Sequence, residues 1–442
     1  MDQWHLDIVS PSYIFGAVAV AGFLYLVNVF ASLLPQNPLR NVPGPWYIRW
    51  TSIVIKYHGL KGNRARYQHD LHLQYGPLVR LSPNEVSTTS LSSIKKIYNA
   101  RETYRKTPWN KDLSVATEEL LNTNHIELHR KLRRLFSGSI KGGAPTPSKG
   151  RPCDAEDRKE MERRGAADVI KWFLFMATDI IGELSFEDPF RTLEIGEVSG
   201  YTKDLDNLGY MGAVRSGFPT SIAMAKYLPL PFFRRPLQAT KNMIRYAEES
   251  ITRYRNLVNS DPTSVKWTLF TKVFQDSDKV KEALTPVELR ANASASLVAS
   301  SDSTAVALTY LVWSVCRHPA VKAALLEELR TLPSDFTPSH LPGLSYLNQV
   351  LDETLRLYSG IQSSLPRLVP DGGDGVAGHW LPQGTTFCAQ AYSLHRMASV
   401  FPDPDVFDPS RWAVPTREMK DALMPFGNGS RTAKFFLTYP EA

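Results

Sequence analysis

The feature that most constrains the fold of this chain is a set of three short motifs between residues 353 and 431. The first, Glu353-Thr354-Leu355-Arg356, lies in a stretch from Leu344 to Tyr358 whose pattern predicts a helix. A spacing of three places Glu353 and Arg356 on one helix face, within ion-pair reach. The others are Phe407-Asp408-Pro409-Ser410-Arg411-Trp412 and Pro425-Phe426-Gly427-Asn428-Gly429-Ser430-Arg431. A charged pair on a helix or a glycine-rich turn is common on its own. The informative feature is therefore the order in which the three motifs follow one another.

In this order the three motifs resemble those of the cytochrome P450 family. The resemblance implies that Glu353, Arg356 and Arg411 form a buried charged triad behind a haem. Ser410 stands where the family usually has glutamate, a change that the triad should tolerate. The third motif resembles the family's haem-binding loop. Phe426 and Arg431 are therefore expected at the cofactor, heme b (iron protoporphyrin IX).

The loop departs from the family at the residue that matters most for its chemistry. The family's iron ligand is a cysteine two residues after the arginine, and here that position is Ala433. A methyl group cannot bind iron, whereas a thiolate does, so we assign no metal ligand. The C-terminal part of the fold is also expected to be missing. Either the chain is a mis-assembled gene model of an active enzyme, or it is a catalytically dead remnant of the family.

The N-terminal region predicts a membrane anchor. Residues 13–34 are apolar apart from Asn28 and Ser32, and the run spans roughly 33 Å as a helix, enough for a bilayer core. The basic residues after it predict that the bulk of the chain is cytosolic. We therefore expect a short lumenal N-terminus (1–12), a transmembrane helix (13–34) and a P450 catalytic domain (35–442) on the endoplasmic reticulum membrane.

The net charge and the cysteine content limit the kinds of binding partner and the redox compartment that fit this chain. The net charge of +7 is compatible with an anionic membrane or an acidic protein. No nucleic-acid motif or repeat accompanies it, so a nucleic-acid partner is not expected. The three cysteines, Cys153, Cys316 and Cys388, are widely separated and show no metal-ligand spacing. This pattern fits a reducing compartment.

The remaining pattern predicts a mainly α fold with small β-sheets. Residues 78–87 read as a hairpin, residues 88–358 are mostly helical, and strand-like pieces return at Leu365–Val369 and Thr385–Ala389. Residues 138–165 are poor in apolar side chains and predict a disordered loop, where the family normally has helix. With the tail 433–442, this atypical insert is interpreted as intron or wrong-frame translation.

A helix from Asn292 to Cys316 contains Ala299-Ser300-Ser301-Asp302-Ser303-Thr304, which resembles the distal helix of the family. Cleavage of dioxygen in an apolar pocket needs a supply of protons, which an acid and a hydroxyl can relay. The resemblance gives these catalytic roles to Asp302 and Thr304. Thr304 is also expected to bond a carbonyl in the preceding turn and to open the helix locally.

The two haem propionates need cationic partners. The resemblance assigns this role to His129 and Arg133, which share one face of a basic helix, and to Arg367 and Arg431. The other basic residues of this helix, Arg130, Lys131 and Arg134, are expected to point away from the haem. Two interpretations of this second face stay open: a merely solvated surface, or a patch that binds an acidic electron-donor protein.

The function implied by the resemblance is haem-thiolate monooxygenation. Electrons would come from NADPH through a cytochrome P450 reductase, and one oxygen atom from O2 would enter a lipophilic small molecule. The amino-acid sequence around Trp172 and Gly182 resembles filamentous-fungal members of the family that act on terpenoid or polyketide intermediates of secondary metabolism.

Overall fold

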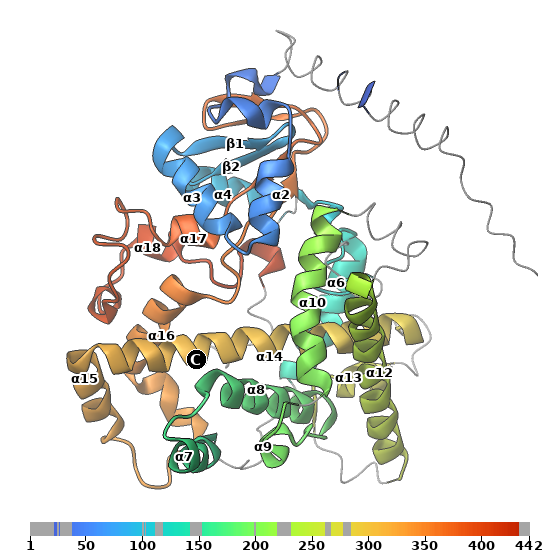
Figure 1. Cartoon of the computed structure of the whole chain (residues 1–442), viewed down its shortest axis with the longest axis vertical. Helices are drawn as coiled ribbons and strands as arrows, with labels where there is room; N and C mark the ends of the chain where they lie inside the picture. The colour runs from blue at the N-terminus through green and yellow to red at the C-terminus, as the bar shows by residue number, and fades with distance from the viewer. Residues whose placement is uncertain are drawn as a thin grey trace, which may run out of the picture.

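The computed structural model combines a smaller part built around a sheet with a larger helical part (Figure 1). It describes residues 22–23, 26, 38–99, 101, 103–110, 118–141, 153–198, 200–218, 231–260, 267–276 and 284–432. The anchor expected at 13–34 lies almost wholly outside these residues, as do Ala433 and the tail to 442. The expectation of a mainly α fold with small sheets is confirmed.

The sheet part begins with two short 3-10 helices, η1 (Pro38–Asn41) and η2 (Trp46–Arg49). Its α-helices are α2 (Ile53–Leu60), α3 (Arg64–Tyr75), α4 (Leu91–Ile97), α17 (Ala391–Leu394) and α18 (Arg417–Ala422). Its strands are β1 (Leu78–Ser82), β2 (Glu85–Thr88), β3 (Arg105–Lys106), β4 (Arg367–Leu368), β5 (Asp374–Val376), β6 (His379–Leu381) and β7 (Thr386–Cys388).

The main sheet joins segments that are far apart in the sequence. Its strand order is β1-β2-β7-β4-β3, and β5 and β6 form a separate pair. The predicted hairpin is confirmed, because β1 and β2 are antiparallel with Val79 opposite Ser87. Strand β7 then runs parallel to β2, with Phe387 opposite Val86. The two strand-like pieces predicted after residue 364 are confirmed as β4 and β7.

The helical part is built around one long helix. Its elements are α6 (Ile126–Lys141), α7 (Cys153–Arg164), α8 (Val169–Phe186), α9 (Thr192–Ile195), α10 (Gly200–Gly217), α12 (Pro231–Ser260), α13 (Thr271–Asp276), α14 (Pro286–Arg317), α15 (Pro319–Leu329), η3 (Pro338–Gly343) and α16 (Ser345–Tyr358). The short turns η4 (Pro409–Trp412) and η5 (Gly429–Arg431) follow near the end of the described chain.

Helix α14 crosses the helical part and packs against α8, α12 and α16 (Figure 1). It starts six residues before the predicted Asn292, because Thr285 and Glu288 form a capping box around Pro286 at the first turn. Among the described residues, α14 is the helix long and apolar enough to cross a membrane by length and composition. Within the protein, 22% of its most apolar window is buried.

The prediction of a disordered loop over 138–165 is wrong for two stretches. Helix α6 continues to Lys141, and α7 forms from Cys153 to Arg164; residues 142–152 lie outside the described chain. The buried carboxylate of Glu160 on α7 contacts α8. Glu160 accepts hydrogen bonds from Trp172 Nε1 at 2.7 Å and from Lys171 Nζ at 3.0 Å. These two bonds lower the pKa of Glu160 to about 2, the Lys171 bond contributing most.

Candidate functional site

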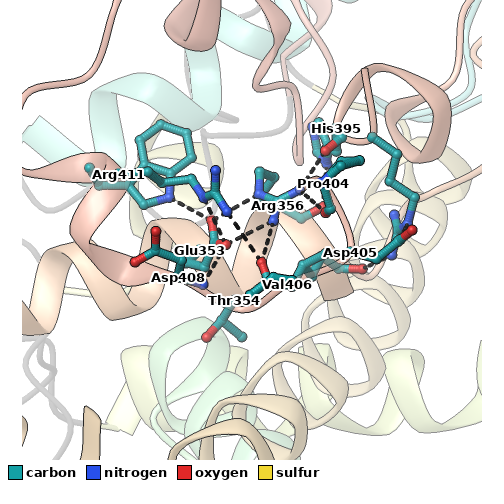
Figure 2. A network of polar contacts seen from close by, with 12 residues as sticks. Glu353, Thr354, Arg356, His395, Pro404, Asp405, Val406, Asp408 and Arg411 are labelled. Carbon is teal, nitrogen blue, oxygen red and sulfur yellow. Dashed lines mark hydrogen bonds and ion pairs between the residues drawn. The ribbon is translucent and has the colours of Figure 1, made fainter. Parts of the chain in front are cut away.

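The predicted triad forms around a buried carboxylate on α16. Arg356 donates from Nε and Nη2 to the two oxygens of Glu353, each at 2.8 Å, and Arg411 Nε donates to Glu353 Oε1 at 3.1 Å (Figure 2). The side chains of Glu353 and Arg356 are 0% exposed. The two residues, one helix turn apart, thus form a core ion pair, and the structure brings the three predicted partners together.

Two further donors complete the coordination of the Glu353 carboxylate. Trp412 Nε1 donates to Oε2 at 2.9 Å, and the Asp408 backbone N–H donates to Oε1 at 2.9 Å. Ser410 donates instead to Asp408 Oδ1 at 2.6 Å. The triad therefore closes without the family's usual glutamate at 410, as expected.

Arg356 also fixes the irregular chain between α17 and η4. Its Nη1 donates to the carbonyls of His395 and Pro404, both at 2.6 Å, and its Nη2 to that of Val406 at 3.2 Å (Figure 2). The guanidinium lies 5.0 Å from the centre of the Phe401 ring, a cation–π distance. One buried cation therefore donates to three carbonyls of this segment, and the Val406 carbonyl accepts a second bond from Arg411 Nη2 at 3.3 Å.

His395, to which the sequence gave no role, connects this cluster to the glycine-rich loop. Its Nδ1 lies 2.7 Å from the Arg356 carbonyl, and the Met424 backbone N–H donates to its Nε2 at 2.9 Å. A carbonyl only accepts, so Nδ1 carries the proton and the ring is neutral. Burial lowers the pKa of His395 to about 3, in agreement with that tautomer. No sequence signal marks this bridge, because both of its partners are backbone atoms.

The loop itself requires glycine. Gly429 has φ 71°, and a Cβ there would lie 2.2 Å from the Tyr98 carbonyl oxygen. Only glycine accepts both the left-handed backbone and that approach. The turn η5 then presents Arg431, whose Nη1 donates to the Thr123 carbonyl at 2.9 Å. Phe426, predicted at the cofactor, is half-buried at the start of the loop.

Arg367 and Arg431, two of the residues assigned to the propionates, line one pocket. The buried Arg367 guanidinium lies 5.2 Å from the Tyr98 ring centre. Arg105 and Lys106 of β3 line the same pocket, and sequence reasoning missed both. The other described lining residues are neutral: Ile97, Tyr98, Asn99, Tyr104, Asn428 and Ser430. The charged side chains that line this pocket are therefore all cationic. The two adjacent basic residues of β3 were the sequence signal that could have indicated this part of the pocket.

The other predicted cofactor contacts lie on α6. His129 is 4% exposed, and Arg133 is half-buried on the same face. The buried Leu132, Leu135 and Phe136 pack α6 into the helical core.

The predicted catalytic pair lies on α14. Asp302 is exposed and Thr304 is half-buried. Bonds to the preceding turn come from their neighbours, Ser301 to the Leu297 carbonyl and Ser303 to the Ala299 carbonyl, and α14 continues through this region. The helix is thus not opened as predicted. The loop after α16 approaches closely here, since a Cβ on Gly360 would lie 2.9 Å from Ser303 Cβ.

Neither cysteine with a described side chain supplies a thiolate to the loop. Cys388 lies buried in β7, and burial raises the pKa of its thiol to about 12. Cys316 is exposed at the end of α14. Ala433, at the expected ligand position, has no donor atom.

The chain is similar to known proteins over most of its length. A family profile described as "Cytochrome P450" matches residues 41–432. "Cytochrome P450 monooxygenase tazI" from Aspergillus terreus is 41% identical, over 90% of this chain and 82% of the relative. "Cytochrome P450 monooxygenase orf2" from Aspergillus niger is 39% identical, over 89% and 82%. A zebra fish cytochrome P450 structure with progesterone has a TM-score of 0.62 at 16% identity, covering 84% of this chain and 87% of that one. The chain therefore belongs to the cytochrome P450 family of monooxygenases.

Proposed function

We propose that this fold serves haem-dependent insertion of one oxygen atom from O2 into a lipophilic small molecule, such as a terpenoid or polyketide intermediate of fungal secondary metabolism. Electrons would come from NADPH through a cytochrome P450 reductase. The catalytic domain would face the cytosol, anchored in the endoplasmic reticulum membrane by residues 13–34. The fungal relatives named as monooxygenases support the reaction class.

The observation that carries the proposal is the continuous set of bonds from the triad to the loop. Glu353 and Arg356 hold the chain around His395, and His395 holds Met424 at the start of the loop. The loop ends on Arg431, beside Arg367 in a pocket lined by cations. In this proposal the scaffold would hold the cofactor in a set orientation.

The described residues fit the carboxylate side of heme b and do not fit its iron. Arg367 and Arg431 would hold a propionate, with His129 and Arg133 as further proposed contacts. When a thiolate ligates its iron, the group supplies oxygen activation. Ala433 provides no such ligand. In this proposal Asp302 donates protons through the Thr304 hydroxyl toward the substrate pocket.

The experiment is a comparison of the full chain with an Ala433→Cys variant, each reconstituted with haem in detergent. The variant is expected to gain the carbon-monoxide difference band that is characteristic of thiolate ligation, and the chain with Ala433 to lack it. A further Arg367→Gln, Arg431→Gln double variant should weaken haem binding in both backgrounds. Haem titration by absorbance measures that loss independently of turnover.

The outcomes test whether this fold binds haem with thiolate ligation once a cysteine stands at residue 433. If Ala433→Cys binds haem without the thiolate band, or neither protein binds haem, the proposed function is wrong. The band in the chain with Ala433 would refute the ligand argument itself.

A further inference from the structure

The segment that precedes α6, residues 118–123, borders the pocket that Lys106 and Arg431 line, which we call the cationic pocket. The Leu121 carbonyl of this segment accepts a hydrogen bond from Lys106 Nζ. Its Thr123 carbonyl accepts one from Arg431 Nη1 at 2.9 Å. Two cations of the pocket are therefore bound to the backbone of one short segment.

A buried carboxylate lies in the same segment. Glu119 is 6% exposed, and its Oε2 accepts the Leu121 backbone N–H at 2.9 Å. Leu121 is thus held by Glu119 at its N–H and by Lys106 at its carbonyl. The charge of Lys106 also favours the ionised form of the Glu119 carboxylate. These two side chains therefore act on each other directly and through the residue that both of them bind.

The backbone around Glu119 is held by groups that do not titrate. The Leu120 N–H donates to Oδ1 of Asn292, which is 2% exposed on α14, at 3.0 Å. The Glu119 N–H donates to Asn122 Oδ1 at 2.8 Å. Neither amide changes its charge with pH, so a change in the charge of Glu119 should leave the segment folded.

The charged groups near Glu119 come from β3, from η5 and from its own segment. Lys106 and Arg431 are the contributions of the first two, and both bind backbone carbonyls of the segment. Within the segment and just after it, Glu118 and His125 pair with each other at 3.5 Å. Of these groups, Lys106 is the one whose charge lowers the pKa of Glu119.

Burial has the larger effect on Glu119. It raises the pKa of this carboxyl to about 7, against the opposing effects of the Leu121 bond and of Lys106. A carboxylate bound in the cationic pocket would bring another negative charge to Lys106 and Arg431, close to Glu119. Like charges favour protonation, and a protonated Glu119 leaves the charge of Lys106 to the bound carboxylate. Because linkage is reciprocal, proton uptake and carboxylate binding strengthen each other.

We propose that Glu119 is a positioning residue of the cationic pocket, which takes up a proton when a carboxylate binds beside Lys106 and Arg431 and releases it when that carboxylate leaves. That the carboxylate is a haem propionate rests on the proposed function. The proton comes from solvent and forms an O–H bond on the Glu119 carboxylate, and no other covalent bond changes. The pocket consequently binds carboxylates more tightly as the pH falls.

The test is a haem titration by absorbance of the full chain in detergent, comparing the unchanged chain with Glu119→Gln. Glutamine has nearly the shape of the protonated carboxyl and carries no titrating charge. From about pH 6 to about pH 8, the haem affinity of the unchanged chain should fall about five-fold more than that of Glu119→Gln, which corresponds to a rise of about 1 in the Glu119 pKa on binding. Equal pH profiles would overturn the proposal.

Neighbouring variants assign the effect to its residues. Glu118→Gln is the matched control, because Glu118 is adjacent in sequence but pairs with His125; its pH profile should follow that of the unchanged chain. Lys106→Arg should keep the pH dependence. Lys106→Gln should weaken it, because without that cation Glu119 is already largely protonated over this range. Loss of the dependence in Glu118→Gln, or its full retention in Lys106→Gln, would contradict the assignment.

Two further readouts distinguish proton uptake from a purely structural role. Calorimetric haem titrations near neutral pH, in two buffers of different ionisation enthalpy, measure the protons taken up, and the uptake should be smaller in Glu119→Gln. Haem dimethyl ester has no carboxylate, so the pH profiles of the two proteins for this probe should coincide. If Glu119→Gln weakens the binding of haem and of its ester equally at every pH, Glu119 only supports the loop and the proposal is wrong.

The outcomes also distinguish the role of Glu119 from the proposed function. A thiolate band in Ala433→Cys together with equal pH profiles would refute the role of Glu119 and leave the proposed function standing. A pH profile that depends on Glu119, without the thiolate band, would do the reverse. If none of these proteins binds haem, both are wrong.

Discussion

Replacing Glu353 with glutamine tests whether the triad is a structural core or a surface ion pair placed by chance. Glu353→Gln keeps the size of the side chain but removes the charge that five hydrogen bonds surround. It leaves Arg356, which is 0% exposed, and Arg411, which is 9% exposed, without their counter-charge. Removing one partner of a buried pair costs about 3–5 kcal/mol. We expect a loss of that size in the free energy of unfolding.

The chain contains its own control for this prediction. Glu327 and Arg330 are also three residues apart, at the C-terminal end of α15, and they pair at 3.3 Å with side chains 80% and 74% exposed. Exposed pairs of this kind contribute about 0–1 kcal/mol, so Glu327→Gln should change stability by less than about 1 kcal/mol. Equilibrium urea unfolding of the full chain in detergent, followed by circular dichroism, measures both. If the two variants shift the midpoint equally, the argument from burial is refuted.

Two other substitutions test the link from the triad to the loop. The pKa of His395 is lowered in the folded protein, so the unfolded chain binds the extra proton as pH falls below about 6.5, and stability is lost toward the folded value of about 3. From pH 6 to 4, the free energy of unfolding of the unchanged chain should fall by about 1.4 kcal/mol per pH unit more than that of His395→Gln. Urea midpoints that change in parallel for the two proteins across that range would contradict the neutral ring. Gly429→Ala should cost about 1–3 kcal/mol more than Gly378→Ala, because both glycines have positive φ but only Gly429 lies against backbone, at Tyr98. Urea midpoints that fall together would show that this contact relaxes.

The sequence predicted those parts of the fold in which the pattern is local. The helix of the first motif ends at Tyr358 as expected, and the hairpin at residues 78–87 forms as an antiparallel pair of strands. The triad was also predictable, because a spacing of three on a helix fixes two of its members. Its third member depended on the resemblance, since nothing local joins residue 411 to residue 353.

The other predictions from the sequence failed for physical reasons that the structure identifies. Helix α7 was missed because its sequence, Cys153–Arg164, is almost wholly polar and has no apolar stripe. His395 was missed because it binds backbone atoms, which no residue pattern reveals. The predicted opening of α14 at Thr304 was wrong, because the helix stays continuous there; the hydroxyls that bond carbonyls of the preceding turn are those of Ser301 and Ser303.

The buried Glu160 carboxylate concentrates polar contacts between α7 and α8 at one point of the protein. Dispersed apolar contacts weaken gradually, but the bonds of Glu160 to Lys171 and Trp172 are lost together when that carboxylate is displaced or protonated. Helix α7 is therefore suited to detach as one unit while α8 stays packed on α14, a local opening far below the free energy of global unfolding. Trp172, 3% exposed beneath it, would report each opening through its own fluorescence.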